Sequence, residues 1–301
     1  MKVLLAGASG AIGTALSRSL VQHGHVIRTL VRRPASGSTE VTWRPDRGEL
    51  DQAALNGIDA VICLSGAGVA EKRWTDEYKQ VMRSSRIDSV CTLARAITET
   101  ATPPKVFLSA SAVGYYGDAG AAAIDESAPA GDGFLAGLCV DWEAATAPAE
   151  AAGVRVAHLR TGLVLDASTG LLAKLAPLYR FGLGGKLGSG EQYWPWISLV
   201  DEIASIEHLL TSEVHGGVNL TGPAPVTNAD FSATLGRVLH RPAVLPVPGF
   251  ALRAALGEFS SDVLTGQRAL PVKLKASGFA FRHSTLTEAL TTSLGRAQTR
   301  V

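Results

Sequence analysis

Residues 3–13 read VLLAGASGAIG, and this stretch decides the fold. Val3–Ala6 is a short apolar run of the kind that forms a strand buried on both faces of a parallel sheet. From Ile12 onward, apolar residues recur at helical spacing until Gly24, a residue type that commonly ends a helix. Three glycines join the two patterns. The stretch therefore predicts a strand, a tight turn and a helix in direct succession.

The spacing of the three glycines, GxxGxxG, indicates a dinucleotide site. Gly7 allows the tight turn, Gly10 lets a pyrophosphate approach the backbone at the helix N-terminus, and Gly13 lets the helix pack closely on the sheet. The alternative is a glycine-rich turn without a ligand, but the position between a strand and a helix favours the dinucleotide. We therefore expect cofactor contacts from Gly7, Ser9, Gly10, Ala11, Ile12 and Gly13.

The end of the second predicted strand, residues 25–31, bears on the choice of cofactor. A site for NAD usually places an acidic residue there, on the ribose 2′-hydroxyl. The chain instead continues Val31-Arg32-Arg33-Pro34. A guanidinium binds a 2′-phosphate through charge-assisted hydrogen bonds, so the sequence favours NADP(H) and predicts that Arg32 contacts the phosphate. The alternative is a solvated basic turn.

Further apolar runs at 59–64, 105–108 and 154–159 predict strands, and 134–152 predicts a helix. Strands that alternate with helices predict a parallel sheet. From about residue 166 the pattern changes, with five glycines between 182 and 190 and several prolines after 222. The predicted fold class is α/β. A Rossmann-like doubly wound sheet spans 1–165, and a smaller C-terminal substrate lobe spans 166–301, with part of the lobe returning to the sheet.

The composition excludes several classes of partner. The chain has 301 residues, with 28 Lys and Arg against 27 Asp and Glu, so its net charge of +1 gives no electrostatic reason to expect nucleic acid. No apolar run approaches the roughly 18 residues that a membrane helix needs. The start of the chain resembles a signal peptide only briefly, because glycines and Arg18 interrupt the apolar run.

The cysteines and histidines carry no metal pattern. Cys63, Cys91 and Cys139 lie far apart without a CxxC pair, and the seven histidines form no HExxH motif. We therefore expect no metal site and no disulfide framework, and a reduced, cytoplasmic compartment is the simplest expectation.

The later segments resemble a known family. SASAVGYYG at 109–117 is similar to the serine-bearing segment of extended short-chain dehydrogenases and sugar-nucleotide epimerases. Closer still, the chain resembles the NAD(P)-dependent epimerase family of atypical extended members, which has its own C-terminal extension. Further segments that carry the resemblance are LSG at 64–66, KRWT at 72–75, SRI at 85–87, LRTG at 159–162, PVTN at 225–228 and GQRALP at 266–271. The resemblance implies a Rossmann-like sheet and a small substrate lobe.

For catalysis, the resemblance implies a serine, a tyrosine and a lysine, the last two in a YxxxK pair on the helix after the serine. Ser111 takes the serine position, with Ser109 as a close competitor. The helix reads FLAGLCVDWE at 134–143, and with Glu143 as the acid that follows the pair, Leu135 and Cys139 stand where tyrosine and lysine are expected. A structural cysteine is favoured over a reactive thiolate. Tyr115 and Tyr116 each carry a phenol that can substitute as proton donor, and Tyr115 is the chosen candidate, with structural packing or hydrogen bonding as the alternative.

The remaining predicted contacts come from the resemblance and from the position of loops at the carboxyl ends of strands. They are Ser65, Gly66 and Ala67 near the adenine ribose, Gly162 and Leu163 near the nicotinamide, and Ser109 and Arg160 from the family segments. Small residues in tight turns are the alternative for the loops. Arg73, Arg86, Arg160 and Arg268 suit a substrate phosphate or carboxylate, or else form salt bridges.

The expected function is an NADP(H)-dependent oxidoreductase or epimerase that acts on a small, sugar-like or anionic molecule. The alternative is an NADP(H)-binding sensor or regulatory protein that has lost catalysis, because the tyrosine and lysine are missing. A small-molecule substrate is the expected partner, nucleic acid and membrane are not, and a homodimer is left open.

Overall fold

The computed structural model describes residues 1–298, and contacts divide the chain into two compact units. Unit 1 contains Met1–Ala112, Gly137–Arg160 and Ile203–Val218. Unit 2 contains Val113–Ala136, Thr161–Glu202 and the chain from Asn219 onward. The predicted boundary near residue 165 stays a prediction, because contacts do not show which segments fold independently. The last three residues of the predicted lobe lie outside the described residues.

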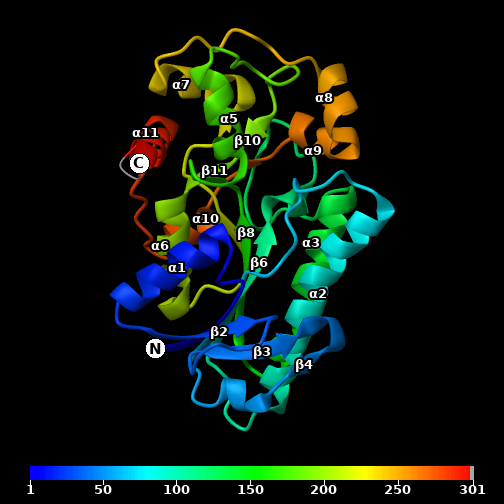
Figure 1. The fold of residues 1–301 in the computed structure, drawn as a ribbon, viewed down its shortest axis with the longest axis vertical. Coiled ribbons are helices and arrows are strands. Elements are labelled where there is room, and N and C mark those ends of the chain that lie inside the picture. The colour runs from blue at the N-terminus through cyan, green and yellow to red at the C-terminus, as the bar shows by residue number, and fades with distance from the viewer. Residues whose placement is uncertain (299–301) are drawn as a thin grey trace. The chain divides into compact units, whose positions relative to one another are not determined.

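Most of unit 1 is built on an eight-stranded sheet in the order β12-β8-β6-β5-β1-β2-β3-β4 (Figure 1). β1 pairs in parallel with β2 and β5, and β5 pairs in parallel with β6, whereas β3 and β4 are antiparallel. This mostly parallel order confirms the predicted Rossmann-like fold. The strands are β1 (Lys2–Ala6), β2 (Val26–Val31), β3 (Glu40–Arg44), β4 (Glu49–Leu50), β5 (Ala60–Cys63), β6 (Val106–Ala112), β8 (Arg155–Thr161) and β12 (Gly216–Leu220).

The core of unit 1 explains why the central strands are apolar on both faces. Leu4 pairs with Val61, Val61 pairs with Phe107, and all three are fully buried. Strands that helices cover on both sides lose the alternation of polar and apolar residues. The helices are α1 (Ala11–Gln22), α2 (Asp76–Glu99), α3 (Phe134–Ala144), α4 (Ala147–Ala151) and α6 (Leu199–Thr211), with 3₁₀ turns η1 (Pro45–Arg47) and η2 (Gln52–Leu55).

Three details of the sequence prediction are wrong. The single helix expected at 134–152 is two helices, α3 and α4, and Pro148 lies in the first turn of α4, where its missing N–H costs least. β3 and β4 were not expected. β6 runs on to Ala112, so Ser109 and Ser111 lie within the strand and not after it, because Ser109 continues the ladder opposite Cys63.

Unit 2 has a second core, in which Trp194, Trp196, Phe231 and Leu235 are buried. Its strands form short pairs: β9 (Leu163–Leu165) with β11 (Trp196–Ser198), β10 (Tyr193–Trp194) with β13 (Val226–Thr227), and β7 (Ala123–Ile124) with β14 (Arg268–Ala269). Its helices are α5 (Gly170–Arg180), α7 (Asn228–Val238), α8 (Gly249–Leu256), α9 (Ser260–Leu264), α10 (Val272–Ala276) and α11 (Leu286–Gln298), with 3₁₀ turns η3 (Val113–Tyr116) and η4 (Gly257–Phe259). Among the described helices, none is both long and apolar enough to cross a membrane.

Candidate functional site

The glycine loop lies where the strand order reverses. β2 and β3 extend to one side of β1, and β5, β6 and β8 extend to the other. Ligands of open α/β sheets bind beyond the carboxyl ends of the strands at such a switch point. The loop from Gly7 to Gly10 joins the carboxyl end of β1 to α1, so the topology places it at this point.

The three glycines have different reasons to be glycine. Gly7 has φ +87°, and a Cβ there would lie 2.7 Å from the carbonyl carbon of Leu64. A Cβ on Gly13 would lie 2.1 Å from the Gly7 carbonyl oxygen, which is far inside contact distance. Gly10 is different, because its Cβ would meet only the Gly7 oxygen, at an ordinary 3.5 Å. The fold requires glycine at 7 and 13, and it leaves room at 10.

The N-terminus of α1 has no side chain that satisfies it. Gly10 is the N-cap, no side chain caps the helix, and the first turn holds no acidic residue. The first N–H groups of a helix lack partners within the helix and carry the positive end of its dipole. A pyrophosphate fits both properties.

The two arginines after β2 have different environments. Arg33 donates to both carboxylate oxygens of Glu40, at 2.8 and 2.6 Å, and Ser36 also donates to Glu40. These bonds lower the pKa of Glu40 to about 2. Arg32 is exposed, and its guanidinium makes no hydrogen bond or ion pair within residues 1–298. Glu40 lies seven residues after Arg33, on the unpredicted β3, so the sequence does not show that this acid is close to the arginines. In the fold, Arg33 neutralises Glu40.

The loop after β5 is tied to the glycine loop and to α2. Gly7 packs against the backbone of Leu64 and Ser65, which is why a Cβ at Gly7 has no space. Ala67 donates its N–H to the Ser85 hydroxyl at 3.0 Å. The backbone of Gly66 lies against the Arg86 side chain. Unit 1 thus brings the predicted glycine loop and the predicted residues 65–67 together.

Ser111 is part of a buried polar network. Its hydroxyl donates to Glu143 Oε1 at 2.7 Å. Arg160 binds the same carboxylate with two hydrogen bonds of 2.8 Å. The side chains of Arg160 and Glu143 are only 6% and 11% exposed, so this is a largely desolvated, bidentate ion pair. His158 Nδ1 approaches Glu143 at 3.6 Å, and the other ring nitrogen lies 2.9 Å from the Thr146 hydroxyl.

This network changes how two predicted site residues are understood. Arg160 is engaged with Glu143, and its predicted contact with the cofactor stays a prediction. Ser111 gives its only proton to Glu143, so it offers a ligand its oxygen lone pairs. Ser109 is fully buried on the same strand, two residues earlier, and its predicted contact also stays a prediction. Glu143, used in the sequence only as a landmark, joins these groups from a distant segment.

The positions expected to hold tyrosine and lysine carry no acid–base group. Cys139 is 3% exposed, and burial raises the pKa of its thiol to about 11. Its sulfur lies 3.8 Å from the Ala112 carbonyl oxygen, to which it donates. This supports the structural interpretation of Cys139. Leu135, in unit 2, lies against Gly114, where its Cβ is 3.3 Å from the position a Gly114 Cβ would take.

Two tyrosines in unit 2 are distinguished by their partners. The Tyr116 hydroxyl is buried and donates to Asn219 at 2.7 Å, which gives it a structural role. Tyr115 is half-buried, and its ring packs edge-on against Tyr116 with 5.3 Å between ring centres. Tyr115 therefore stays the candidate proton donor, as a prediction.

The predicted nicotinamide contacts in unit 2 have backbone partners already. Gly162 donates its N–H to Leu220 at 3.0 Å, and Leu163 donates to Pro195 at 2.8 Å. A Cβ on Gly162 would lie 2.1 Å from the Pro195 oxygen. The tight turn alone explains this glycine, so contacts of Gly162 and Leu163 with a ligand stay predictions and would use carbonyl oxygens.

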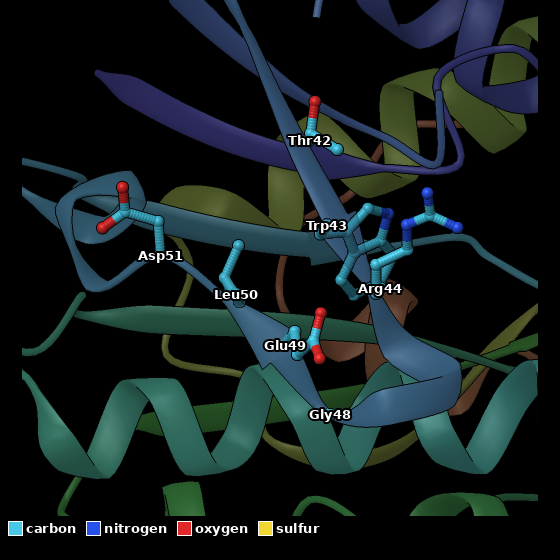
Figure 2. A pocket seen from close by; sticks show the side chains of 7 residues that line it. All are labelled: Thr42, Trp43, Arg44, Gly48, Glu49, Leu50 and Asp51. Carbon is cyan, nitrogen blue, oxygen red and sulfur yellow. The ribbon is translucent and has the colours of Figure 1, made fainter. Parts of the chain in front are cut away.

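A hollow of about 540 Å³ lies elsewhere in unit 1, on the β3–β4 hairpin (Figure 2). Figure 2 shows Asp51 and Arg44 at opposite ends of the group, with their charged ends apart. The hollow contains none of the predicted site residues. The residues that line it are Thr42, Trp43, Arg44, Gly48, Glu49, Leu50 and Asp51.

No group of His, Cys, Asp and Glu among the described residues is arranged to hold a metal ion.

Comparison with known proteins agrees with this architecture. Residues 3–220 match the NAD dependent epimerase/dehydratase family, and residues 247–292 match a domain of unknown function, DUF1731. An epimerase family protein of Mycobacterium leprae is 46% identical over 290 residues, which cover 96% of this chain and 94% of that protein. Human epimerase family protein SDR39U1 is 35% identical, with 96% and 98% covered.

Two solved structures show the same arrangement. The human SDR39U1 structure, determined with NADPH, has a TM-score of 0.89 and 32% identity, and the match covers 98% of this chain and 99% of that one. A nucleoside-diphosphate sugar epimerase from Corynebacterium glutamicum has a TM-score of 0.80 and 32% identity, with 98% of this chain and 58% of that one covered. With its sheet order, its glycine loop and matches along nearly its whole length, the chain belongs to the NAD dependent epimerase/dehydratase family.

Proposed function

We propose that the chain binds NADP(H) at the β1–β5 switch point and acts as an oxidoreductase or epimerase on a small, sugar-like or anionic substrate. The observation that carries the cofactor assignment is Gly10. It has space for a side chain in the folded protein, yet it caps a helix N-terminus that no side chain satisfies. A pyrophosphate explains both facts. The relative solved with NADPH supports this proposal.

Arg32 supports the choice of the phosphorylated cofactor. Its guanidinium has no protein partner within residues 1–298, and it directly follows β2, where the adenosine ribose is expected. Glu40, the acid closest in sequence, is held by Arg33 and Ser36 and does not compete for Arg32. We assign the 2′-phosphate to Arg32.

Ser111 suggests which substrate group is bound. Because its proton is donated to Glu143, Ser111 can accept a hydrogen bond, and a substrate hydroxyl is a suitable donor. A nicotinamide, when bound, exchanges a hydride with a substrate carbon. Within this proposal, Ser111 orients the hydroxyl on that carbon, Glu143 and Arg160 hold Ser111 in place, and Tyr115 is the candidate proton donor.

A second candidate function is an NADP(H)-binding sensor without catalysis. Leu135 and the protonated Cys139 favour it, because neither supplies the proton transfer that typically contributes about 10²–10⁴-fold to rate. A homodimer and a cytoplasmic compartment stay predictions.

The test separates the two functions. NADPH binding is measured first, by fluorescence titration, and then its oxidation against a panel of carbonyl compounds, with NADP⁺ reduction against sugar alcohols. Sustained turnover that Tyr115→Phe lowers and Tyr116→Phe spares supports the enzyme. Tight binding without turnover supports the sensor. Absence of NADPH binding would overturn the proposal.

A further inference from the structure

Arg86 is a buried cation without an anionic partner. It lies on α2 and is 8% exposed. One of its nitrogens donates to the Met82 carbonyl oxygen at 2.9 Å, and its guanidinium carbon lies 5.0 Å from the ring centre of Trp142. Within residues 1–298, no carboxylate forms an ion pair with it. A guanidinium has five N–H donors, so most of its hydrogen-bonding capacity is unused.

The other arginines in unit 1 show what is unusual about this one. Arg160, which is buried to a similar degree, has both oxygens of Glu143. Arg83, one turn earlier on α2, forms an ion pair with Asp141 at the surface. Burying a charge without a partner is costly, and buried charges in proteins are normally paired. Arg86 therefore lacks the anion that its environment demands.

The groups that face Arg86 do not supply that anion. Burial keeps the Cys139 thiol protonated, with its pKa at about 11. The Tyr78 hydroxyl donates to the Gly68 carbonyl oxygen at 2.6 Å and has a raised pKa through burial. Glu71 acts on Arg86 only through space, from beyond ion-pair distance, and it is exposed. Burial lowers the pKa of Arg86, as expected for a cation that lacks compensation.

The position of Arg86 connects it to the ligand site. Its guanidinium lies against the backbone of Gly66, where a Cβ would come within 3.1 Å of the guanidinium carbon. Gly66 is in the loop at the carboxyl end of β5, the strand on one side of the switch point. Glycine at this place lets the cation approach the loop backbone.

We propose that Arg86 is the cation of an oxyanion subsite beside Gly66, which holds a carboxylate or phosphate group of a bound ligand. The subsite deepens the proposed function, since the oxyanion belongs either to NADP(H) or to the substrate. Cys139, a titratable group on α3 that acts on Arg86, stays protonated and so brings no charge of its own to the subsite.

The probes are inorganic phosphate and NADPH, and the variants are Arg86→Met, which keeps length and removes charge, and Arg83→Met as the matched control on the same helix. Gly66→Ala is a second variant, which keeps Arg86 and displaces its guanidinium. Circular dichroism checks each fold. Melting temperature is followed against phosphate concentration with and without saturating NADPH, and NADPH affinity is measured separately.

Phosphate is expected to raise the melting temperature of the wild type and of Arg83→Met by more than that of Arg86→Met, whose remaining response comes from the proposed glycine-loop and Arg32 sites. If the oxyanion belongs to the cofactor, Arg86→Met also weakens NADPH binding by about 10–100-fold, and saturating NADPH abolishes the response of the wild type to phosphate. If it is the substrate's, NADPH affinity is unchanged and the saturated protein still responds. Gly66→Ala should weaken whichever binding Arg86→Met removes.

The proposed subsite is overturned if Arg86→Met responds to phosphate and binds NADPH as the wild type does. This includes the outcome in which neither protein responds to phosphate. A purely structural cation over Trp142 gives that pattern together with a lower melting temperature. Should the wild type bind no NADPH, the proposed function fails, whereas the phosphate measurement without cofactor still decides the role of Arg86.

Discussion

The glycine loop and helix α3 depart from their expected patterns to very different degrees. In the loop, the fold requires glycine at 7 and 13, and the proposed pyrophosphate gives a reason for glycine at 10, where the fold leaves room for a side chain. On α3, the positions for tyrosine and lysine hold Leu135 and Cys139, neither of which exchanges protons near neutral pH. The contrast indicates that the requirements for binding a dinucleotide are met independently of the usual catalytic pair.

The two regions also differ in how charge is arranged. The N-terminus of α1 is a partial positive charge without a side-chain partner. Around α3, Glu143 is surrounded by Ser111, Arg160 and His158, so its interactions are nearly saturated. The first arrangement suits an incoming anion, whereas the second fixes the direction of the Ser111 hydroxyl.

The largest expected effect concerns Gly10. Gly10→Val should abolish NADPH binding, by more than about 100-fold, because a branched side chain fills the space of the pyrophosphate. The variant should stay folded, since a Cβ at 10 meets only the Gly7 oxygen at 3.5 Å. Gly13→Ala is the contrasting variant and should lose stability instead. Calorimetric titration measures the loss of binding, and thermal melts measure the loss of stability. If Gly10→Val binds NADPH with wild-type affinity, the glycine loop does not bind the pyrophosphate.

The second prediction concerns the network on the α3 side. Glu143→Ala should destabilise the protein by about 3–5 kcal/mol, because it removes the carboxylate that forms the ion pair with the buried Arg160. Glu150→Ala is the control, since the Glu150 side chain is half-exposed and its one ion pair among the described residues is with His158, at 3.8 Å. It should cost less than about 1 kcal/mol. Urea unfolding measures both, and equal losses in the two variants would contradict the importance of the ion pair.

How far these regions were predictable depends on the range of the interactions that build them. The βα unit at residues 3–22 follows from local spacing, because its strand, turn and helix each have a short-range signal. Glu143 and Arg160 are distant in sequence from Ser111, and no local pattern links them. β3 lacks a strong apolar run, so the pairing of Glu40 with Arg33 could not be foreseen. That Arg86 has no anionic partner among the described residues can be seen only when its neighbours are placed in three dimensions.

The third prediction concerns a carboxyl group in unit 2. Glu202 is fully buried on α6, accepts from Thr161 at 2.9 Å, and has a second oxygen without a partner. Burial raises its pKa from 4.5 to about 8. The folded state therefore holds a proton that the unfolded state has released, so stability falls as pH rises through this range and levels off above it.

Glu202→Gln should remove this dependence, because the amide does not ionise. At pH 9 the variant should gain on the wild type by a few kcal/mol relative to the difference between them at pH 4. Urea unfolding at a series of pH values measures the difference. If the difference stays constant over the whole range, burial does not raise the pKa of Glu202 in the folded protein.

The fourth prediction compares the two neighbouring arginines. Arg32→Ala should weaken NADPH binding by about 10–100-fold and leave NADH binding almost unchanged, because NADH has no 2′-phosphate. Arg33→Ala should change neither by much, since Arg33 is engaged with Glu40. The preference for NADPH should shrink at high salt because Arg32 is exposed. Equal wild-type affinities for NADPH and NADH would leave Arg32 as a surface charge.

The smallest effect is expected at Cys139, and it sharpens the contrast with the glycine loop. With a pKa of about 11, the thiol is protonated throughout the working range, so it offers no thiolate and no positive charge in place of lysine. Cys139→Ser keeps a group that can donate to Ala112 and should change stability by less than about 1 kcal/mol and any activity by less than about threefold. Thiol labelling gives an independent check, because the exposed Cys91 should react first and Cys139 only as the protein unfolds. A hundredfold loss of activity in a folded Cys139→Ser would show instead that Cys139 takes part in catalysis. Helix α3 would then serve catalysis through a different residue type and not lack a catalytic role.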